Sequence, residues 1–186
     1  MKQNILWKGI ENDSLENCMV NFTNEGSVIN STIIGKGQDL IYKVVYHIKT
    51  NQLWETTYLE IEFQLGDNIK TVRFRSDGKG NWTTNGKPVE AFNGCIDVDI
   101  TLTPFTNSLP INRLKLAVNE VKQIKVLYLN VLNQEISSVY QKYTRLSANE
   151  YKFETVPNDF EAIIETDELG LVVSYPQLFR RLLITE

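Results

Sequence analysis

The segment from Asn93 to Leu116 reads NGCIDVDITLTPFTNSLPINRLKL, and its first half decides the fold class. Apolar and polar side chains alternate there, and this period of two is typical of a half-buried β-strand. The apolar face would carry Ile96, Val98, Ile100 and Leu102, and the polar face would carry Cys95, Asp97, Asp99 and Thr101.

The second half of this segment predicts a partner strand. After a connection from Pro104 to Pro110, alternation resumes from Ile111 to Val118, with Arg113 and Lys115 on the polar side. We therefore expect one antiparallel hairpin whose polar face gathers two carboxylates and two cations. Since opposite charges favour pairing across strands, we expect Asp99 to contact Arg113, Lys115 or another cation.

The remaining chain reads as further short strands separated by turn residues. Two longer hairpins are predicted, from Ile41 to Gln64 and from Lys122 to Leu146. About a dozen strands result, and the only helix we expect is one short turn beginning at Pro176. The sequence predicts a single all-β domain over residues 1–186, with antiparallel meanders that close into a barrel or roll.

Charge and composition exclude several function classes. The net charge is -4 without any run of lysine or arginine, so we expect no nucleic-acid partner. Cys18 and Cys95 lie far apart, and His47 is the single histidine. His47 alternates with lysines on the polar side of its strand, which predicts a solvated histidine. We expect neither a metal site nor a cofactor.

The sequence also predicts where the protein works. Residues 1–8 lack the apolar run of a signal peptide, and no stretch approaches the ~20 apolar residues that a membrane helix requires. We therefore expect a cytoplasmic protein with reduced cysteines.

Four groups of residues carry a resemblance that extends along most of the chain. They are Gly94–Asp99 followed by Thr103–Leu114, Gly80–Trp82 with Asn85–Gly86, Gln141–Tyr143, and Asp167–Pro176. In these segments the chain resembles the bacterial family called putative glycolipid-binding proteins. The resemblance implies an antiparallel spiral β-roll or open barrel, similar in shape to the periplasmic carriers that move lipoproteins between bacterial membranes.

The leading hypothesis is therefore non-enzymatic binding of a lipid or glycolipid in an apolar hollow. Inward apolar residues would receive acyl chains, and basic and tyrosine side chains would hold a polar head. The candidate ligand-binding residues are Arg113, Arg145, Asp97, Asp99, Tyr143, Trp54 and Trp82, with the two tryptophans stacking on sugar.

Two other function classes stay open. Asp97 and Asp99 project from one strand face about 7 Å apart, and this spacing suits a carbohydrate-acting hydrolase, which needs two carboxyl groups. Pairing with cations would lower both pKa values, however, and a general acid needs a raised pKa. The third hypothesis is a structural or interaction protein without a ligand, in which the residues from Pro104 to Pro110 only fix a connection.

Overall fold

Fifteen strands join in one continuous sheet in the computed structural model, which describes residues 1–37 and 40–186. The strands of the first half are β1 (Lys2–Gly9), β2 (Ser14–Thr23), β3 (Gly26–Gly37), β4 (Leu40–Thr50), β5 (Thr56–Leu65), β6 (Asn68–Ser76), β7 (Trp82–Thr84) and β8 (Lys87–Pro88). The strands of the second half are β9 (Asp97–Ile100), β10 (Val121–Asn130), β11 (Glu135–Arg145), β12 (Glu150–Val156), β13 (Glu161–Thr166), β14 (Val172–Tyr175) and β15 (Phe179–Thr185).

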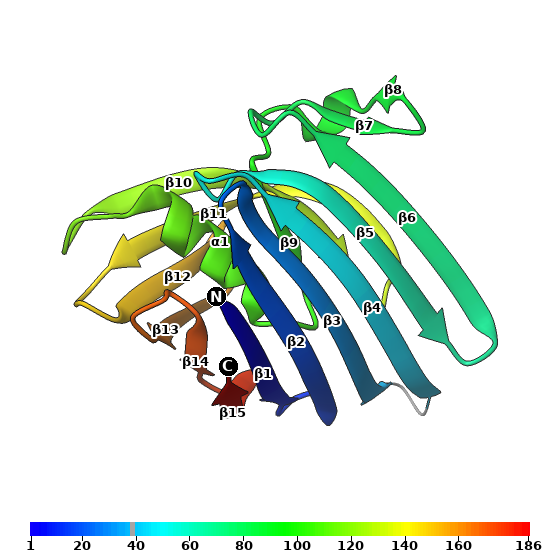
Figure 1. Ribbon diagram of the computed structural model, residues 1–186, viewed down its shortest axis with the longest axis horizontal. Helices are drawn as coiled ribbons and strands as arrows, with labels where there is room; N and C mark the ends of the chain where they lie inside the picture. The colour runs from blue at the N-terminus through cyan, green and yellow to red at the C-terminus, as the bar shows by residue number, and fades with distance from the viewer. Residues whose placement is uncertain (38–39) are drawn as a thin grey trace.

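The sheet consists of two meanders that meet where the chain begins and ends. Each strand from β1 to β8 pairs with the next, as does each strand from β9 to β15, and β15 pairs antiparallel with β1. The two chain ends therefore lie side by side in the middle of the sheet (Figure 1). Because β8 and β9 are its two edges, the sheet stays open and does not close into a barrel. The predicted all-β roll is confirmed.

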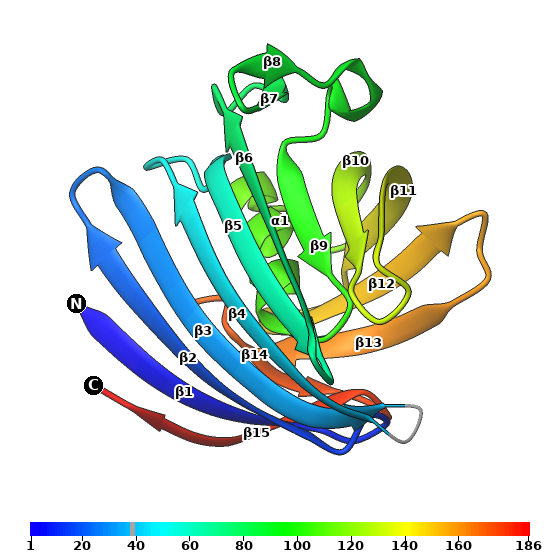
Figure 2. The same cartoon turned by 90° about the vertical axis from the view of Figure 1, so that its right-hand side faces the viewer.

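Alternation along the strands directs apolar side chains inward. In β4, Tyr42, Val44, Tyr46 and Ile48 are buried, in agreement with the predicted hairpin between β4 and β5. The hairpin predicted from Lys122 to Leu146 is also confirmed, as β10 and β11. In Figure 2 the strands β1 to β6 form one curved wall and β10 to β13 another, with a helix between them.

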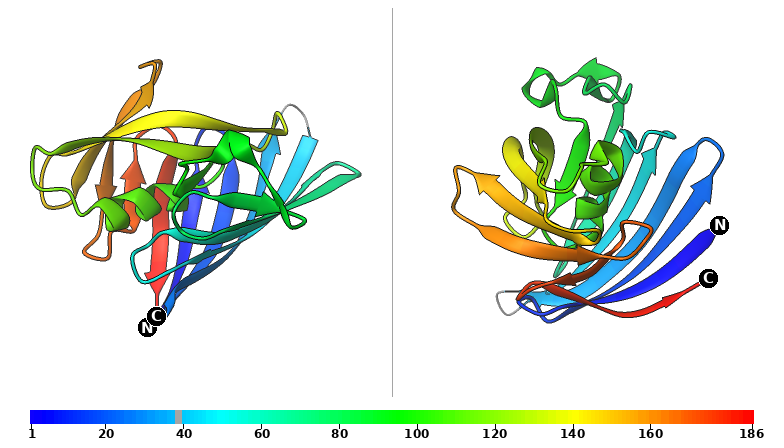
Figure 3. Two further views of the ribbon diagram at one scale, coloured as in Figure 1. Left: turned by 90° about the horizontal axis from the view of Figure 1, so that it is seen from above. Right: turned by 90° about the vertical axis from the view of Figure 1, so that its left-hand side faces the viewer.

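The helix between the walls corrects the prediction for the central segment. The structure has α1 (Phe105–Leu114) where we expected a connection and a second strand, and β9 pairs parallel with β10. Parallel neighbours need a crossover connection of about a dozen residues or more, which α1 supplies. Seen from above, α1 lies across the space that the sheet encloses (Figure 3).

The sequence did not reveal α1 because the helix has no polar stripe facing water. Its residues from Phe105 to Ile111 are all buried, including Thr106, Asn107 and Ser108, so the amphipathic pattern of a surface helix is missing. Pro104 and Pro110 also read as breaks in any regular element. Tertiary packing decides this helix, and intrinsic propensity does not.

Two shorter segments complete the fold. The short helix predicted at Pro176 is wrong, since residues 176–178 form a turn that lets Tyr175 pair with Phe179 across β14 and β15. A 3₁₀ turn, η1 (Glu90–Phe92), follows β8. Within residues 1–37 and 40–186, no helix is long and apolar enough to cross a membrane.

Candidate functional site

A pocket of about 850 Å³ opens on the inner side of the second meander. Strands β9 to β12, β14 and β15 contribute to it, together with the turn between β1 and β2. Its walls are rich in rings: Tyr128, Tyr140, Phe153, Phe160, Tyr175 and Phe179. Phe160 lies 6.2 Å from both Phe153 and Tyr175, measured between ring centroids. The ring of Tyr175 in turn lies 6.0 Å from that of Phe179. These four rings, Phe153, Phe160, Tyr175 and Phe179, therefore form one continuous aromatic surface.

Asp99 brings a carboxyl group to this pocket from the edge strand β9. Its Oδ2 accepts a hydrogen bond from Gln141 Nε2 at 2.6 Å, and its Oδ1 accepts one from Thr106 Oγ1 at 3.1 Å. Burial raises the pKa of Asp99, and these two hydrogen bonds partly offset that effect. In the part of the chain that the structure describes, no cation forms an ion pair with Asp99, so the predicted contact with Arg113 or Lys115 is wrong.

Two tyrosines share this polar end of the pocket with Asp99. Burial raises the pKa of both Tyr128 and Tyr175, and the nearby negative charge of Asp99 raises them further. Both therefore keep their phenolic protons at neutral pH and act as hydrogen-bond donors. Asp99, Tyr128 and Tyr175 together bring one acceptor and two donors to the pocket lining.

Tyr143 lies behind the pocket and does not face it. Its side chain is buried, and its hydroxyl donates a hydrogen bond to Asn107 Oδ1 at 2.9 Å. Asn107 lines the pocket from α1. Tyr143 is thus placed to orient a pocket residue.

Arg113 pairs with Asp97, which is the neighbour of Asp99 on β9. The guanidinium donates from Nε at 3.0 Å and from Nη2 at 2.5 Å, and the Asp97 side chain is fully buried. Burial raises the pKa of Asp97, while the Arg113 guanidinium acts in the opposite direction. This bidentate pair joins the end of α1 to β9 and stands outside the pocket lining.

The carboxyl groups of Asp97 and Asp99 consequently have different environments. Asp97 is held by a cation inside the protein, whereas Asp99 faces a pocket with neutral hydrogen-bond donors. The structure does not bring them together as the two carboxyl groups of one reaction centre. We expected the two carboxyl groups to share one polar face of a hairpin. In the structure, residues of α1 and β11 cover this face and give the two carboxyl groups different hydrogen-bond partners.

Arg145 belongs to a second, smaller pocket of about 320 Å³. Its guanidinium donates to the backbone carbonyls of Leu116, Ser147 and Ala148 at 2.8 to 3.0 Å. These bonds hold the turn after β11, so most of the donor capacity of Arg145 serves the backbone.

Neither candidate tryptophan lies in the lining of the large pocket. Trp82 is buried, and its Nε1 donates to the carbonyl of Cys95 at 2.6 Å, which fixes η1 and the approach to β9. Trp54 is half-buried in the turn before β5 and packs edge-on against Phe22 at 6.0 Å. Both side chains contribute to the packing of the first meander.

A buried acid that we did not select from the sequence lies close behind the pocket wall. Glu16 Oε1 accepts hydrogen bonds from Tyr46 at 2.6 Å, Ser31 at 2.7 Å and Thr103 at 2.9 Å. Its Oε2 has no hydrogen-bond partner among the described residues. Burial raises the pKa of Glu16 to about 7. Thr103 also lines the pocket, so this hydroxyl separates Glu16 from the open site.

The charge of the pocket lining has one sign. Glu11, Asp99 and Asp159 line it, and among the described residues no lysine or arginine does so. The sequence carried a signal for this site in the concentration of aromatic residues between Tyr151 and Phe179. Nothing in the sequence indicated that Asp99 lies beside them, because β9 and β12 to β15 are far apart along the chain.

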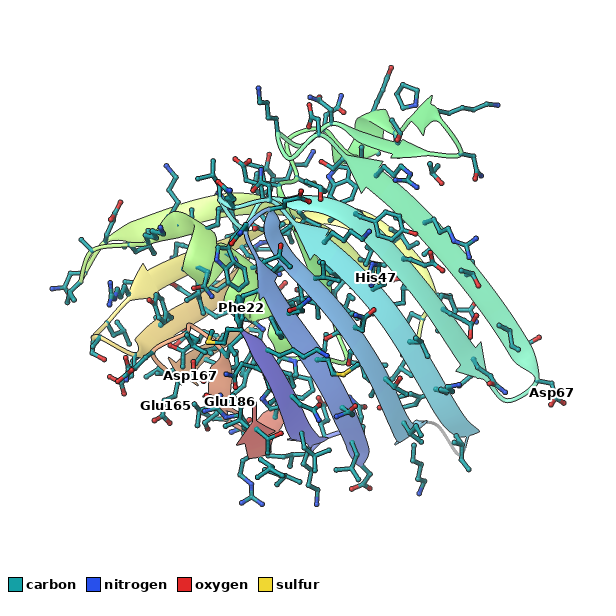
Figure 4. All side chains as sticks on the ribbon, in the orientation of Figure 1. Phe22, His47, Asp67, Glu165, Asp167 and Glu186 are labelled. Carbon is teal, nitrogen blue, oxygen red and sulfur yellow. The ribbon has the colours of Figure 1, made fainter. Side chains whose placement is uncertain are left out.

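His47 lies away from this site, midway along β4 (Figure 4). Its Nδ1 is 2.6 Å from Asn30 Oδ1 on the neighbouring strand, and the side chain is half-buried. Burial lowers its pKa, with a smaller contribution from Lys49. Within the described ranges, no group of three or more His, Cys, Asp or Glu side chains is arranged to hold a metal ion.

Comparison with known proteins gives one family and one solved structure. The profile of the family described as "Putative glycolipid-binding" matches residues 4–181. A crystal structure of a DUF1089 family protein from Pseudomonas aeruginosa is similar at 31% sequence identity and a TM-score of 0.81. The similarity covers 90% of this chain and 92% of that one. No protein with a curated description matches the chain.

Proposed function

Because the chain belongs to the putative glycolipid-binding family, we propose that it binds a lipid or glycolipid, without catalysis, in the 850 Å³ pocket of its second meander. The observation that carries this proposal is a pocket with an aromatic wall and a polar end, which matches the two parts of an amphiphile. Protein pockets for small molecules occupy roughly 300–1,000 Å³, so this pocket has an appropriate size.

The aromatic surface is the part that would receive an apolar chain. Phe153, Phe160 and Phe179 present hydrocarbon edges and faces without hydrogen-bonding groups. Covering this surface removes apolar area from water, which favours binding at roughly 25 cal/mol per Å² before the costs of association.

The polar end would receive the head group. In this proposal Asp99, Tyr128 and Tyr175 contact the ligand, and Tyr143 orients Asn107 behind them. Arg113 with Asp97 holds β9 against α1, and Arg145 holds the turn after β11. Trp54 and Trp82 support the first meander. The cytoplasmic location stays a prediction of the sequence.

Native mass spectrometry tests the proposal directly. We expect the purified protein to carry extra mass that organic extraction releases as a lipid or glycolipid, at near-stoichiometric occupancy. An empty protein that also fails to bind the uncharged fluorescent probe N-phenyl-1-naphthylamine would overturn the proposal.

A pocket-filling variant locates the site. Val139 lines the pocket from β11, so Val139→Trp should reduce the affinity for N-phenyl-1-naphthylamine by about tenfold or more, since the indole occupies the space of the ligand. Val121→Trp is the matched control, because Val121 is exposed at the start of β10 and lies outside the lining. Equal loss of affinity in both variants would contradict this assignment of the site.

A further inference from the structure

We propose that the pocket selects an uncharged, hydroxyl-rich head group such as a neutral sugar, and discriminates against anionic head groups. This inference rests on the proposed function, because it concerns the same pocket. Nothing in the family description specifies the charge of the head group.

The first argument is the sign of the charges around the pocket. An anionic head would meet Glu11, Asp99 and Asp159, while no lysine or arginine of the described chain lines the site. Phosphate and carboxylate groups in proteins are recognised by guanidinium, ammonium or clustered backbone N–H donors. Arg113, which was the candidate cation of the central segment, lies outside the lining and is already bound through two nitrogens to Asp97.

The second argument is the hydrogen-bonding capacity that the pocket leaves free. An ionised carboxylate offers about four acceptor positions, and Asp99 uses two of them for Gln141 and Thr106. In the structure as described, the hydroxyls of Tyr128 and Tyr175 donate to no protein group, although both side chains line the pocket with Asp99 and Tyr128 pairs with Asp99 across β9 and β10.

A sugar hydroxyl both donates and accepts, so it needs an acceptor and a donor side by side. Asp99 supplies the acceptor, and the two phenols supply donors. The amides of Asn12 and Gln177 add groups of both kinds at the pocket lining. A cationic head group could use only the acceptors among these groups, whereas a hydroxyl-rich head group uses the donors and the acceptors together.

The aromatic surface beside Asp99 supports the same ligand. Tyr175 belongs both to the polar end and to the row of rings that includes Phe153 and Phe160. A pyranose ring has apolar C–H faces and polar edges. It can therefore rest on such rings while its hydroxyls reach Asp99.

Three probes with the same twelve-carbon chain test the inference by titration calorimetry below their micelle concentrations. Dodecyl β-D-glucoside is expected to bind about tenfold more tightly than dodecyl phosphate, which the carboxylates of the pocket repel. It is also expected to bind more tightly than dodecyltrimethylammonium, whose head group offers no acceptor to the phenol and amide donors. Equal or tighter binding of either charged probe would overturn the selectivity while leaving the lipid pocket in place. Failure of all three probes to bind would overturn the proposed function itself.

Asp99→Asn separates recognition from general damage to the fold. Without the charge, the glucoside should bind about tenfold more weakly and dodecyl phosphate about tenfold more tightly. Damage to the fold would weaken both probes together, so a parallel loss would contradict the inference. Glu62→Gln is the matched control, because it removes an exposed carboxylate from the outer face of β5 and should change neither affinity.

Discussion

Each meander contains a carboxyl group removed from bulk water, but the surroundings of the two carboxyl groups differ. Glu16 of the first meander is sealed under β4 and the approach to α1, with three hydroxyl donors on one oxygen and none of the described groups on the other. Asp99 of the second meander has one donor on each oxygen and faces a pocket. The first arrangement closes a core, whereas the second leaves acceptor capacity for a molecule from outside.

Helix α1 causes this difference. Phe105 and Leu109 are fully buried in the hydrophobic cluster on the inner side of β1 to β6, so this side of α1 packs into the core of the first meander. The opposite side of α1 faces β11 and the turn before β14 through the polar side chains of Asn107 and Asn112. One buried helix can therefore pack its apolar side into the core of one half of an open roll and contribute a polar side chain to the pocket of the other half.

The largest effect on stability is expected from truncating Phe105, the side chain of α1 that packs into the first meander. Phe105→Ala should lower the free energy of unfolding by about 3–5 kcal/mol, because it deletes a ring from a fully buried position. Urea denaturation measures this loss. Ile69→Ala is the control, since Ile69 is 62% exposed and its truncation should change stability by less than about 0.5 kcal/mol. A loss below about 1 kcal/mol for Phe105→Ala would break the comparison.

An intermediate effect on stability is expected from the ionisation of Glu16, the buried acid of the first meander. The pKa of Glu16 in the folded protein is raised from 4.5 to about 7, so the folded state binds more protons than the unfolded state between these values. Its contribution to stability is complete below pH 4.5 and is lost as the pH rises through about 7. The total change is on the order of 3 kcal/mol.

The variant Glu16→Gln isolates this effect. Burial also raises the pKa values of Asp97 and Asp99, and this contribution is common to the wild type and the variant. Urea denaturation of both proteins from pH 4 to pH 8 should show a steeper decline for the wild type. Parallel curves would show that Glu16 ionises in the folded protein as easily as in the unfolded chain.

The smallest effect on stability is expected from the pocket wall. Phe160 is 36% exposed and touches Phe153 and Tyr175 at 6.2 Å, so Phe160→Ala should cost only about 1 kcal/mol. The same change should weaken binding of N-phenyl-1-naphthylamine several-fold, because the ring belongs to the proposed ligand surface. A large loss of stability with unchanged binding would reverse the roles that we assign to the two meanders.

Some of this architecture could be predicted from the chain because it depends on local alternation. The hairpin of β4 and β5 follows from Tyr42, Val44, Tyr46 and Ile48, whose spacing places them on one face of a strand. The family resemblance extended that prediction to the whole roll; the profile confirms the family over residues 4–181, and the structure confirms the roll.

The site was predicted only in part. Asp99 was selected as a polar strand residue, but its partners were expected among Arg113 and Lys115 and are instead Gln141 and Thr106. Arg113 reaches Asp97 because the segment after Pro104 is a helix, which places Arg113 at its last turn. Alternation over a few residues does not distinguish a strand from a helix that is buried on every side.

The sequence by itself therefore determined most of the β-strands, the all-β class and the family, because strand alternation and family motifs depend on residues that are neighbours in the chain. Only the tertiary structure decided that α1 fills the first meander, that Asp97 is neutralised by Arg113 and that Asp99 faces an aromatic pocket. These features depend on contacts between residues that are far apart in the chain. Asp97 and Arg113 are 16 positions apart, and Asp99 and Gln141 are 42 positions apart. Burial and the choice of partner at such distances are properties of the packed molecule, and no local pattern specifies them.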